Sequence, residues 1–211
     1  MLCRSIAIEG FNKIKSLITD AEMAEIRIEK SGLNVSEIKQ LFSSHNNLIA
    51  TCRDEGITET ERINLLKSAI DGGAKWIDIE VESNQKYSTE LVNYAKAENC
   101  KIIISYHNYN STPNRDELTD IANSCIKIGA DLVKIATMIN NNSDIANLLH
   151  LYSQKTPILA LGMGELGKIT RIAALKMGAP FTFVSCDNES ETAPGQITES
   201  NMRGILGYLS I

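Results

Sequence analysis

Hydrophobic runs alternate with amphipathic segments along the whole chain. Short runs rich in Ile, Leu, Val and Ala, typical of buried strands, occur at residues 2–8, 23–28, 47–52, 75–81, 101–106, 132–137, 157–161 and 181–185. Apolar residues recur at helical spacing near 11–18, 35–43, 58–71, 88–98, 114–128, 142–153, 165–177 and 198–208. Some of these segments begin with capping residues, such as Thr58 with Glu61 three positions later. The pattern therefore predicts strands and helices in strict alternation.

The predicted order of elements favours an α/β fold, specifically a single (β/α)8 TIM barrel over residues 1–211. Strands that are apolar on both faces are typical of a parallel sheet covered by helices. A doubly wound sheet would also alternate strands and helices, but it usually has fewer strands and a glycine-rich phosphate loop after the first strand. Only Ile8-Glu-Gly-Phe11 stands at that place here, and no linker divides the chain.

Composition and charge narrow the functional classes. The net charge of -5 and the absence of a basic run argue against nucleic-acid binding. No apolar stretch is long enough for a signal peptide or a membrane span. The chain has 5 cysteines, without a CxxC pair, and 3 histidines, and neither set shows the spacing of zinc ligands. These features predict reduced thiols and a cytoplasmic protein.

Lys134 interrupts one of the most apolar runs, Leu132-Val-Lys-Ile-Ala136. The residues around it predict a strand that is buried on both faces. Because removing an ammonium from water is costly, a lysine held there can act as a neutral amine near neutral pH. Such an amine is what Schiff-base chemistry on a carbonyl substrate needs. The alternative is a strand-end lysine whose head reaches solvent, and the residue alone leaves both open.

Further polar residues gather at the predicted C-terminal ends of strands, where TIM barrels carry their active sites. They are Glu25, Arg27 and Glu29, then Arg53 and Glu55, then Asp78 and Glu80, then His107. A later predicted strand ends near the apolar Met163, and Arg171 lies on the helix that follows it. Because strand side chains alternate between faces, Glu25 shares a face with Arg27, and Asp78 shares one with Glu80. A barrel wall offers little solvent, so these charges must pair with one another or bind a ligand.

His107 ends an apolar run on the strand that precedes the one carrying Lys134. We expect it at the mouth of the barrel near Lys134, where an imidazole suits proton transfer near neutrality. His45 and His150 lie in or near helical segments without such neighbours, and we interpret them as structural. Asp78-x-Glu80 is a weak motif for a divalent metal. Pairing of these carboxylates with arginines and the lysine of neighbouring strands is the favoured interpretation.

Four segments of the chain carry a family resemblance. They are Ser105-Tyr-His107-Asn-Tyr-Asn-Ser-Thr-Pro113, Ala130-Asp-Leu-Val-Lys134-Ile-Ala136, Gly162-Met163-Gly164 with Arg171, and Ala193-Pro-Gly-Gln196. In this order and spacing they resemble type I 3-dehydroquinate dehydratase, a family of the shikimate pathway. The similarity runs from Glu25 to Gln196. It implies a (β/α)8 barrel that eliminates water from 3-dehydroquinate to give 3-dehydroshikimate.

The resemblance also implies roles for individual residues. Lys134 would form an imine with the C3 ketone, and His107 would remove a proton from C2 and later protonate the departing C1 hydroxyl. Glu55 would orient His107, although the segment around it is shorter than in longer family members. The implied substrate-binding residues are Glu25, Arg27 and Arg53 for the ring hydroxyls, Arg171 for the carboxylate, Met163 and Phe183 for ring packing, and Thr192 and Gln196 in a closing loop. The resemblance implies no cofactor and no metal, and makes a homodimer plausible.

Two alternatives to this function stay open at this point. Another Schiff-base barrel, such as an aldolase acting on a sugar phosphate, would need a phosphate site after the last two strands. The segment 185–192 is acidic, which argues against phosphate there. A catalytically silent barrel that serves as a binding partner would have little reason to keep Lys134, His107 and the arginines, because idle buried charges cost stability.

Overall fold

The protein is described here by a computed structural model in which residues 1–187 and 191–209 are placed. One sheet holds all the strands, with β1 (Leu2–Ile6), β2 (Met23–Arg27), β3 (Leu48–Thr51), β4 (Trp76–Glu80), β5 (Lys101–Asn108), β6 (Leu132–Met138), β7 (Ile158–Met163) and β8 (Thr182–Ser185). The order is β7-β6-β5-β4-β3-β2-β1-β8 and every ladder is parallel. The ring is nearly closed, since β8 returns to β1 and only a β7–β8 ladder is missing among the described residues. The predicted (β/α)8 barrel is confirmed.

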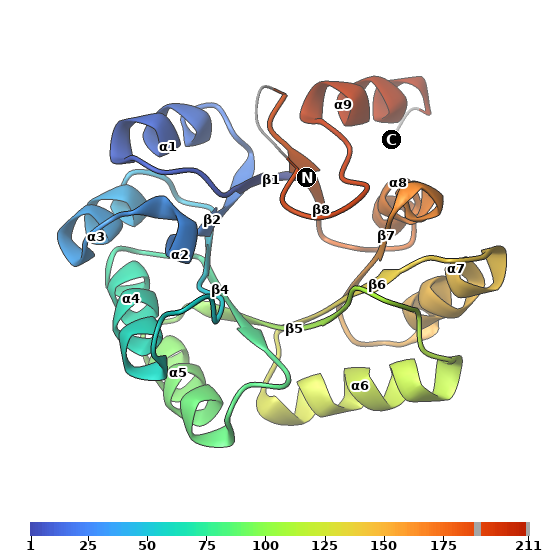
Figure 1. Ribbon diagram of the computed structural model, residues 1–211, viewed down its shortest axis with the longest axis horizontal. Helices are drawn as coiled ribbons and strands as arrows, with labels where there is room; N and C mark the ends of the chain where they lie inside the picture. Colours follow the sequence, from blue (N-terminus) through green and yellow to red (C-terminus); the bar gives the residue numbers. More distant parts are fainter. Residues whose placement is uncertain (188–190, 210–211) are drawn as a thin grey trace.

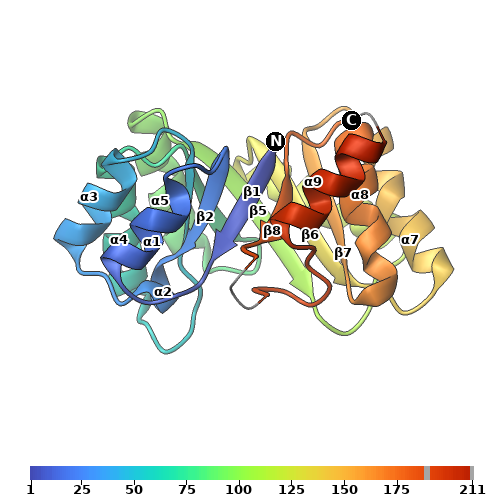
Figure 2. The ribbon, with the colours of Figure 1, turned by 90° about the horizontal axis from the view of Figure 1, so that it is seen from above.

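Helices surround the strands on all sides (Figures 1 and 2). They are α1 (Phe11–Ile18), α2 (Ile28–Ser31), α3 (Val35–Ser43), α4 (Glu59–Asp71), α5 (Gln85–Ala97), α6 (Arg115–Ile128), α7 (Asn142–Leu149), α8 (Lys168–Lys176) and α9 (Glu199–Tyr208), with 3-10 turns η1 (His150–Ser153) and η2 (Glu165–Gly167). The predicted cap of α4 is present as a reciprocal pair between Thr58 and Glu61. In the part of the chain that the structure describes, every helix is too short or too polar to cross a bilayer.

Two strands extend two residues further than the hydrophobic pattern predicted, and both extensions carry site residues. β5 continues through His107 to Asn108 because these residues pair with Ala136 and Thr137 of β6. β7 continues to Met163, which pairs with Met138. The short helix α2 was not predicted; it follows β2 directly and ends at Gly32, whose φ of 65° is a left-handed C-cap that glycine adopts without strain. Polar side chains hid the end of β5 and the helix α2 from a pattern based on hydrophobicity, and Gly162 interrupted the apolar run of β7.

The barrel interior is layered. Apolar side chains fill the part of the interior nearer the N-terminal ends of the strands: Cys3, Met23, Ile49, Ile103, Leu132, Leu159, Phe181 and Phe183. The next interior position of most strands is polar instead. Thr51 pairs directly with Asp78, and Ser105 pairs directly with Lys134. Because paired residues of a parallel sheet point to the same face, these side chains lie together above the apolar layer. A larger apolar cluster between the strands and the helices forms the rest of the core.

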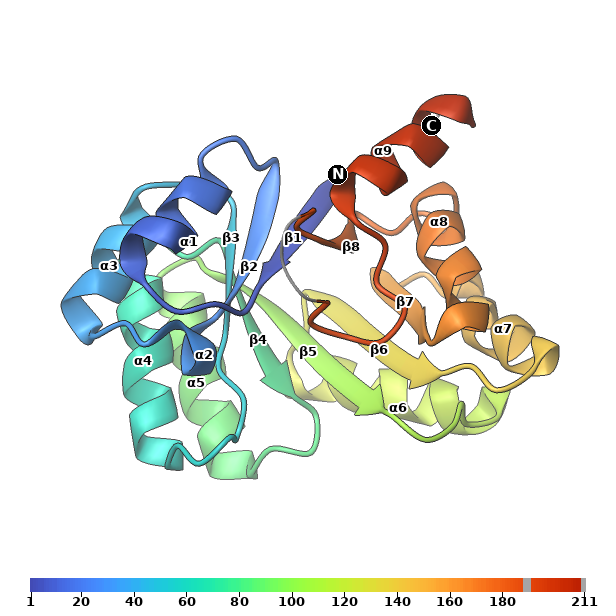
Figure 3. The same cartoon turned by 45° about the horizontal axis from the view of Figure 1, so that its top comes forward.

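Residues 191–198, which precede α9, run across the end of the barrel where the strands finish (Figure 3). The amide of Gly164, after β7, donates to the carbonyl of Pro194 at 3.1 Å. Gly195 has a φ of 73°, and a Cβ at this position would collide with the backbone of Gly164. Glycine at both places therefore allows two loops that are distant in sequence to pack backbone against backbone.

Candidate active site

Lys134 is buried inside the barrel, with 6% of its surface exposed. Its Nζ lies 3.0 Å from Oδ2 of Asp78 and 3.7 Å from Oε1 of Glu25. The ring of Phe183 lies below it, with Nζ 4.5 Å from the ring centroid. The alternative of a strand-end lysine that reaches solvent is therefore wrong. The predicted neutral amine stays a prediction, because the structure shows Lys134 between two carboxylates.

The two carboxylates beside Lys134 are themselves held by hydroxyl groups. Glu25 accepts hydrogen bonds from Ser5 at 2.6 Å and Thr51 at 2.9 Å. Burial would raise the pKa of Glu25, but the positive charges of Lys134 and Arg27 and the hydrogen bond from Ser5 together outweigh burial, and the pKa is lowered. Asp78 is buried too, yet its pKa is held well below its usual range by Arg53 and Lys134. Both acids are therefore anions in the free site.

Arg53 completes this network and connects it to the next strand position. Its Nη2 lies 2.9 Å from Asp78, and its Nε lies 3.7 Å from Glu80. The predicted structural pairing of the Asp78-x-Glu80 carboxylates with neighbouring cations is thus confirmed. Among residues 1–187 and 191–209, no group of three or more His, Cys, Asp or Glu side chains is arranged to hold a metal ion.

His107 is half-buried near the end of β5 and lines the same cavity as Lys134. Its ring stacks on Tyr109, with centroids 6.2 Å apart and planes inclined by 15°. Burial lowers the pKa of His107 well below 6.5, and the charges of Lys134 and Arg53 lower it further. The imidazole is therefore neutral near neutral pH, which is the form that can accept a proton.

Arg171 is a buried cation whose guanidinium faces the cavity from α8. Only 2% of its surface is exposed, and its Nε has no hydrogen-bond partner among the described residues. Burial lowers the pKa of Arg171 to about 10, against an opposing effect of Glu191. A buried guanidinium with an unused donor is costly unless a ligand supplies an anion. This residue is therefore ready to bind a carboxylate.

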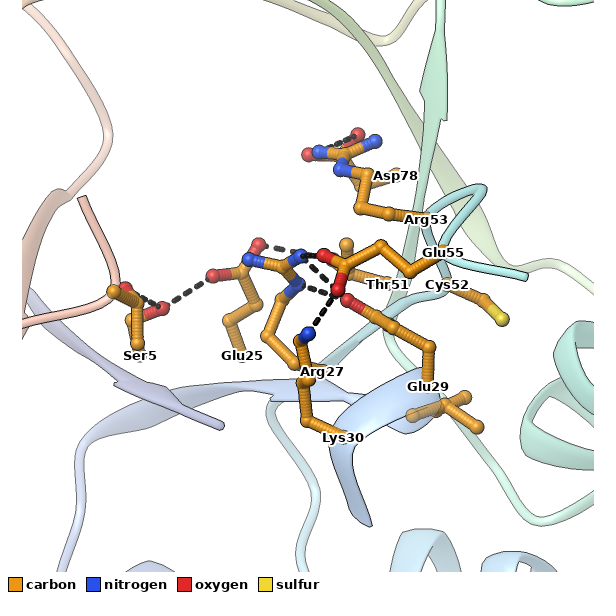
Figure 4. A network of polar contacts seen from close by, with 12 residues as sticks. Ser5, Glu25, Arg27, Glu29, Lys30, Thr51, Cys52, Arg53, Glu55 and Asp78 are labelled. Atoms are coloured by element: carbon orange, nitrogen blue, oxygen red, sulfur yellow. Dashed lines mark hydrogen bonds and ion pairs between the residues drawn. The ribbon is translucent and has the colours of Figure 1, made fainter. Parts of the chain in front are cut away.

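Glu55 lies at the rim of the cavity, and its partners are not those that the sequence predicted. Its carboxylate pairs with Lys30 and with Nη2 of Arg27, the latter at 3.2 Å (Figure 4). Its side chain is 40% exposed. Among the described residues no hydrogen bond joins Glu55 to His107. The predicted orienting role thus needs a movement of Glu55 away from Lys30, and it stays a prediction.

The closing loop places its two predicted residues over β1. Thr192 donates to Oγ of Ser5 at 2.7 Å and to Oε1 of Gln196 at 3.1 Å. Gln196 is 5% exposed and also accepts from the amide of Thr192 at 2.9 Å. Residues 188–190, in the middle of the acidic segment noted in the sequence, lie outside the described residues.

One cavity of about 280 Å³ collects all of these groups at the C-terminal ends of the strands. Its lining includes every residue that the sequence predicted for the site: Glu25, Arg27, Arg53, Glu55, His107, Lys134, Met163, Arg171, Phe183, Thr192 and Gln196. The lysine of β6, a neutral imidazole and a buried guanidinium whose Nε has no hydrogen-bond partner among the described residues therefore face the same space. Such a site suits a small anionic substrate with a carbonyl group.

The sequence model of the type I 3-dehydroquinase family matches residues 6–211. This chain belongs to that family. The 3-dehydroquinate dehydratase of Methanococcus maripaludis strain S2 is 36% identical over 212 residues, covering 96% of this chain and 94% of the relative. That of Methanocaldococcus jannaschii is 33% identical and covers all of both chains. The type I enzyme structure from Clostridium difficile, described with covalent modified comenic acid, has a TM-score of 0.86 at 27% identity and covers 100% of this chain and 92% of that one.

Family membership decides between the alternatives that the sequence left open. The activity is that of a hydro-lyase, 3-dehydroquinate dehydratase (EC 4.2.1.10), in aromatic biosynthesis. The substrate is accordingly a small molecule, and neither the sugar-phosphate aldolase nor the silent barrel is supported.

The cavity of this type I 3-dehydroquinase also contains residues to which the sequence analysis gave no role in the site. Ser5 and Tyr109 line it, and Asp78 and Ser105 lie just beneath, in contact with Lys134 or with each other. Asp78 had a sequence signal, a carboxylate at an interior strand position, and the predicted pairing with an arginine and the lysine of neighbouring strands is present as contacts with Arg53 and Lys134. Ser105 and Tyr109 lie in a segment that carried the family resemblance but were given no role of their own, and Ser5 had no signal, since a single hydroxyl near a strand end is common.

Proposed function

We propose that this enzyme dehydrates 3-dehydroquinate through a Schiff base on Lys134, with His107 as the general acid and base. The observation that carries the proposal is the common cavity of three groups: the buried amine of Lys134, the neutral imidazole of His107 and the buried guanidinium of Arg171. Their chemistry matches the ketone, the acidic C2–H bond and the carboxylate of the substrate. The covalent modified comenic acid of the Clostridium difficile relative is consistent with covalent chemistry at such a site.

Arg171 would bind the substrate carboxylate and so fix the ring. A planar guanidinium can give two parallel hydrogen bonds to a carboxylate, and this one is 2% exposed and has no competing partner at Nε among the described residues. These hydrogen bonds from Arg171 would orient C2 and C3 of the ring toward His107 and Lys134. The carboxylate also adds a negative charge to that of Glu191, which already acts on Arg171.

Lys134 would then react with the C3 ketone. Nζ forms a bond to C3, the ketone oxygen leaves as water, and a cationic iminium remains. When His107 removes the C2 proton, the electrons of the C2–H bond move toward the iminium and give an enamine. The enamine expels the C1 hydroxyl, which takes the proton from His107 and leaves as the second water. Hydrolysis of the new iminium releases 3-dehydroshikimate and restores the amine.

The remaining predicted residues would hold the ring and close the site. Polar side chains contact the ring hydroxyls, apolar ones pack on the ring, and two loop residues exclude water: Glu25, Arg27, Arg53, Met163, Phe183, Thr192 and Gln196. Glu55 would orient His107 after it moves away from Lys30 and Arg27. Exclusion of water from the closed site protects the iminium from hydrolysis before elimination.

The setting of the enzyme is also part of the proposal. All five cysteines are buried, and within the described residues none forms a disulfide. This is consistent with a reducing compartment, and we infer a cytoplasmic enzyme that acts as one barrel domain over residues 1–211. A homodimer is inferred from the family resemblance, and gel filtration with light scattering would test it.

Borohydride trapping tests the Schiff base directly. The protein is incubated with 3-dehydroquinate and borohydride, and the adduct is located by peptide mass spectrometry. Reduction is expected to fix the ligand on Lys134 and nowhere else. Lys134→Met should give no adduct, whereas Lys168→Met, which removes an exposed lysine paired with Glu165, should trap as the wild type does. No adduct on the wild-type enzyme while enone absorbance still rises would sink the proposed mechanism.

A further inference from the structure

Asp78 is the nearer of the two acids beside Lys134, and the family resemblance assigned it no role. It lies on β4 with 1% of its surface exposed, beneath the cavity floor. The sequence interpreted it as one member of a structural charge pair. The structure places it against the nitrogen on which the proposed chemistry takes place.

The two oxygens of Asp78 have separate partners. Oδ1 accepts a hydrogen bond from Ser105 at 2.6 Å and lies 2.9 Å from Nη2 of Arg53. Oδ2 accepts a hydrogen bond from Nζ of Lys134 at 3.0 Å. Because Oδ1 is fixed from two sides, the carboxylate cannot rotate freely, and Oδ2 has a defined position beside the lysine.

Glu25 does not have the same relation to Lys134. Its Oε2 accepts from Ser5 and its Oε1 accepts from Thr51. The distance from Oε1 to Nζ of Lys134 is 3.7 Å, beyond hydrogen-bond range. Glu25 therefore contributes charge from the side of β2, while among the described residues Asp78 alone accepts a hydrogen bond from the amine.

The charged and titratable groups around this pair come from several strands. Lys134 faces Glu25 on β2, Asp78 on β4 and the thiol of Cys3 on β1, and its charge reaches His107 on β5. Asp78 faces Arg53 after β3, in addition to Lys134 and the imidazole. Burial raises the pKa of Asp78, but these cations outweigh it, so this carboxylate stays ionised across the working range.

We propose that Asp78 is a positioning residue that serves as the counter-ion of the Lys134 iminium. This inference rests on the Schiff-base mechanism proposed above. An ammonium and a ketone give an iminium and one water, so Nζ passes two of its three protons to the departing oxygen and keeps one. Oδ2 of Asp78 accepts that remaining N–H, as it accepts the ammonium N–H in the free site. The contact keeps the nitrogen protonated, and only a protonated imine is a strong electron sink when C2 loses its proton.

Asp78→Asn tests the inference, because it keeps the shape of the side chain and removes its charge. We expect kcat to fall by roughly 100-fold, the range seen when one preorganised electrostatic partner is lost. Iminium trapped by borohydride, measured by intact mass over a pH series, should decline at a pH lower than in the wild type by about one unit or more. The shifted alkaline limb is the diagnostic result, since a purely structural role would lower activity without moving it.

The matched control is Asp71→Asn, which removes an exposed aspartate that pairs with Lys39 on the barrel surface. It should show the wild-type kcat and the wild-type trapping profile. Wild-type kcat or an unshifted trapping profile in Asp78→Asn would overturn the role of Asp78. Absence of any adduct on the wild-type enzyme would instead overturn the Schiff-base proposal itself, so the two failures are distinguishable.

A second variant covers the case in which Asp78→Asn does not fold. Asp78→Glu keeps the charge but lengthens the side chain by one methylene, which displaces the oxygen from Lys134. We expect the alkaline limb of trapping to stay near the wild-type position while kcat falls at least about tenfold. Wild-type kcat in this variant would show that the position of the carboxylate is unimportant, and the inference would fail.

Discussion

The carboxylate of Glu55 rests against the ammonium of Lys30 at the rim of the active-site cavity. Glu55 follows β3, and Lys30 belongs to the short helix α2 that continues β2. The pair therefore links the segments that follow β2 and β3 (Figure 4). It also keeps the predicted partner of His107 occupied elsewhere in the substrate-free enzyme.

Lys30→Met tests whether the ion pair with Lys30 keeps Glu55 from interacting with His107. An exposed ion pair is worth about 1 kcal/mol or less, so its loss should raise kcat by no more than about fivefold. Glu55→Gln should lower kcat by at least about tenfold, because the orienting charge is lost. Steady-state kinetics of both variants decide the point. A large fall in kcat for Lys30→Met would mean that Glu55 acts from its paired position.

His107→Ala should separate imine formation from turnover. Without the imidazole, Lys134 still meets the ketone, so borohydride should trap an adduct of the same site. The rate of enone formation should fall by roughly 100-fold to 10,000-fold, the usual contribution of a general acid–base. His150→Ala, which removes an exposed histidine at the end of α7, is the control and should be fully active. Near-normal turnover in His107→Ala would show that another group moves the proton.

As pH decreases, kcat/KM should begin to fall only below the pH range in which an ordinary histidine titrates. The pKa of His107 is lowered well below 6.5 by burial and by Lys134 and Arg53, so the base stays neutral as pH falls through 6.5. We expect kcat/KM to be maintained there and to decline only at lower pH. A kcat/KM profile that already falls with a midpoint at or above 6.5 would contradict this assignment.

The same lowered pKa has a consequence for stability with a defined sign. Below 6.5 the unfolded chain binds a proton at His107 that the folded enzyme does not, so the free energy of unfolding should decrease as pH drops from 6.5 toward the folded pKa. Urea titrations at stepped pH measure this slope. In His107→Asn, which cannot titrate, the part of the slope that begins at 6.5 should disappear, and its persistence would contradict the argument.

Arg171 should strengthen substrate binding while it lowers the thermal stability of the substrate-free enzyme. Arg171→Lys keeps a charge but loses the planar pair of donors, so KM should rise by about 10-fold to 100-fold, as expected for lost charge-assisted hydrogen bonds. Arg171→Met removes a buried cation that has an unsatisfied Nε, so thermal stability without substrate should increase while binding is lost. Calorimetry and initial rates test both effects. A lower melting temperature for Arg171→Met would mean that the guanidinium is satisfied in the free enzyme.

Gly195→Ala should impair closure of the loop over the site. Its φ of 73° is unfavourable for alanine by about 1–2 kcal/mol, and the added Cβ would collide with Gly164. We expect kcat/KM to fall about tenfold, with a small change in melting temperature because the loop lies outside the core. Gly204→Ala is the control: it sits in α9 with open space around it and should leave kinetics unchanged. Equal behaviour of the two variants would rule out a role for this close approach.

Much of the architecture was readable in the sequence because it depends on local patterns. Runs of β-branched residues, caps such as Thr58 and the regular alternation of elements predicted the barrel. The ends of strands were harder, as β5 and β7 show: His107 and Met163 lie in strands because neighbouring strands supply hydrogen bonds. Motif spacing predicted which residues meet in the cavity, since every strand delivers its end to the same side of a TIM barrel.

The sequence by itself determined the fold class, the family and most of the charged residues that meet in the cavity. Only the tertiary structure decided which charges are partners, because the partners are far apart along the chain. Lys134 and Asp78 are separated by 56 positions, and Glu55 and Lys30 by 25. Charge pairing depends on distances of a few ångströms and on the exclusion of water, and both arise only when eight strands close around a common interior.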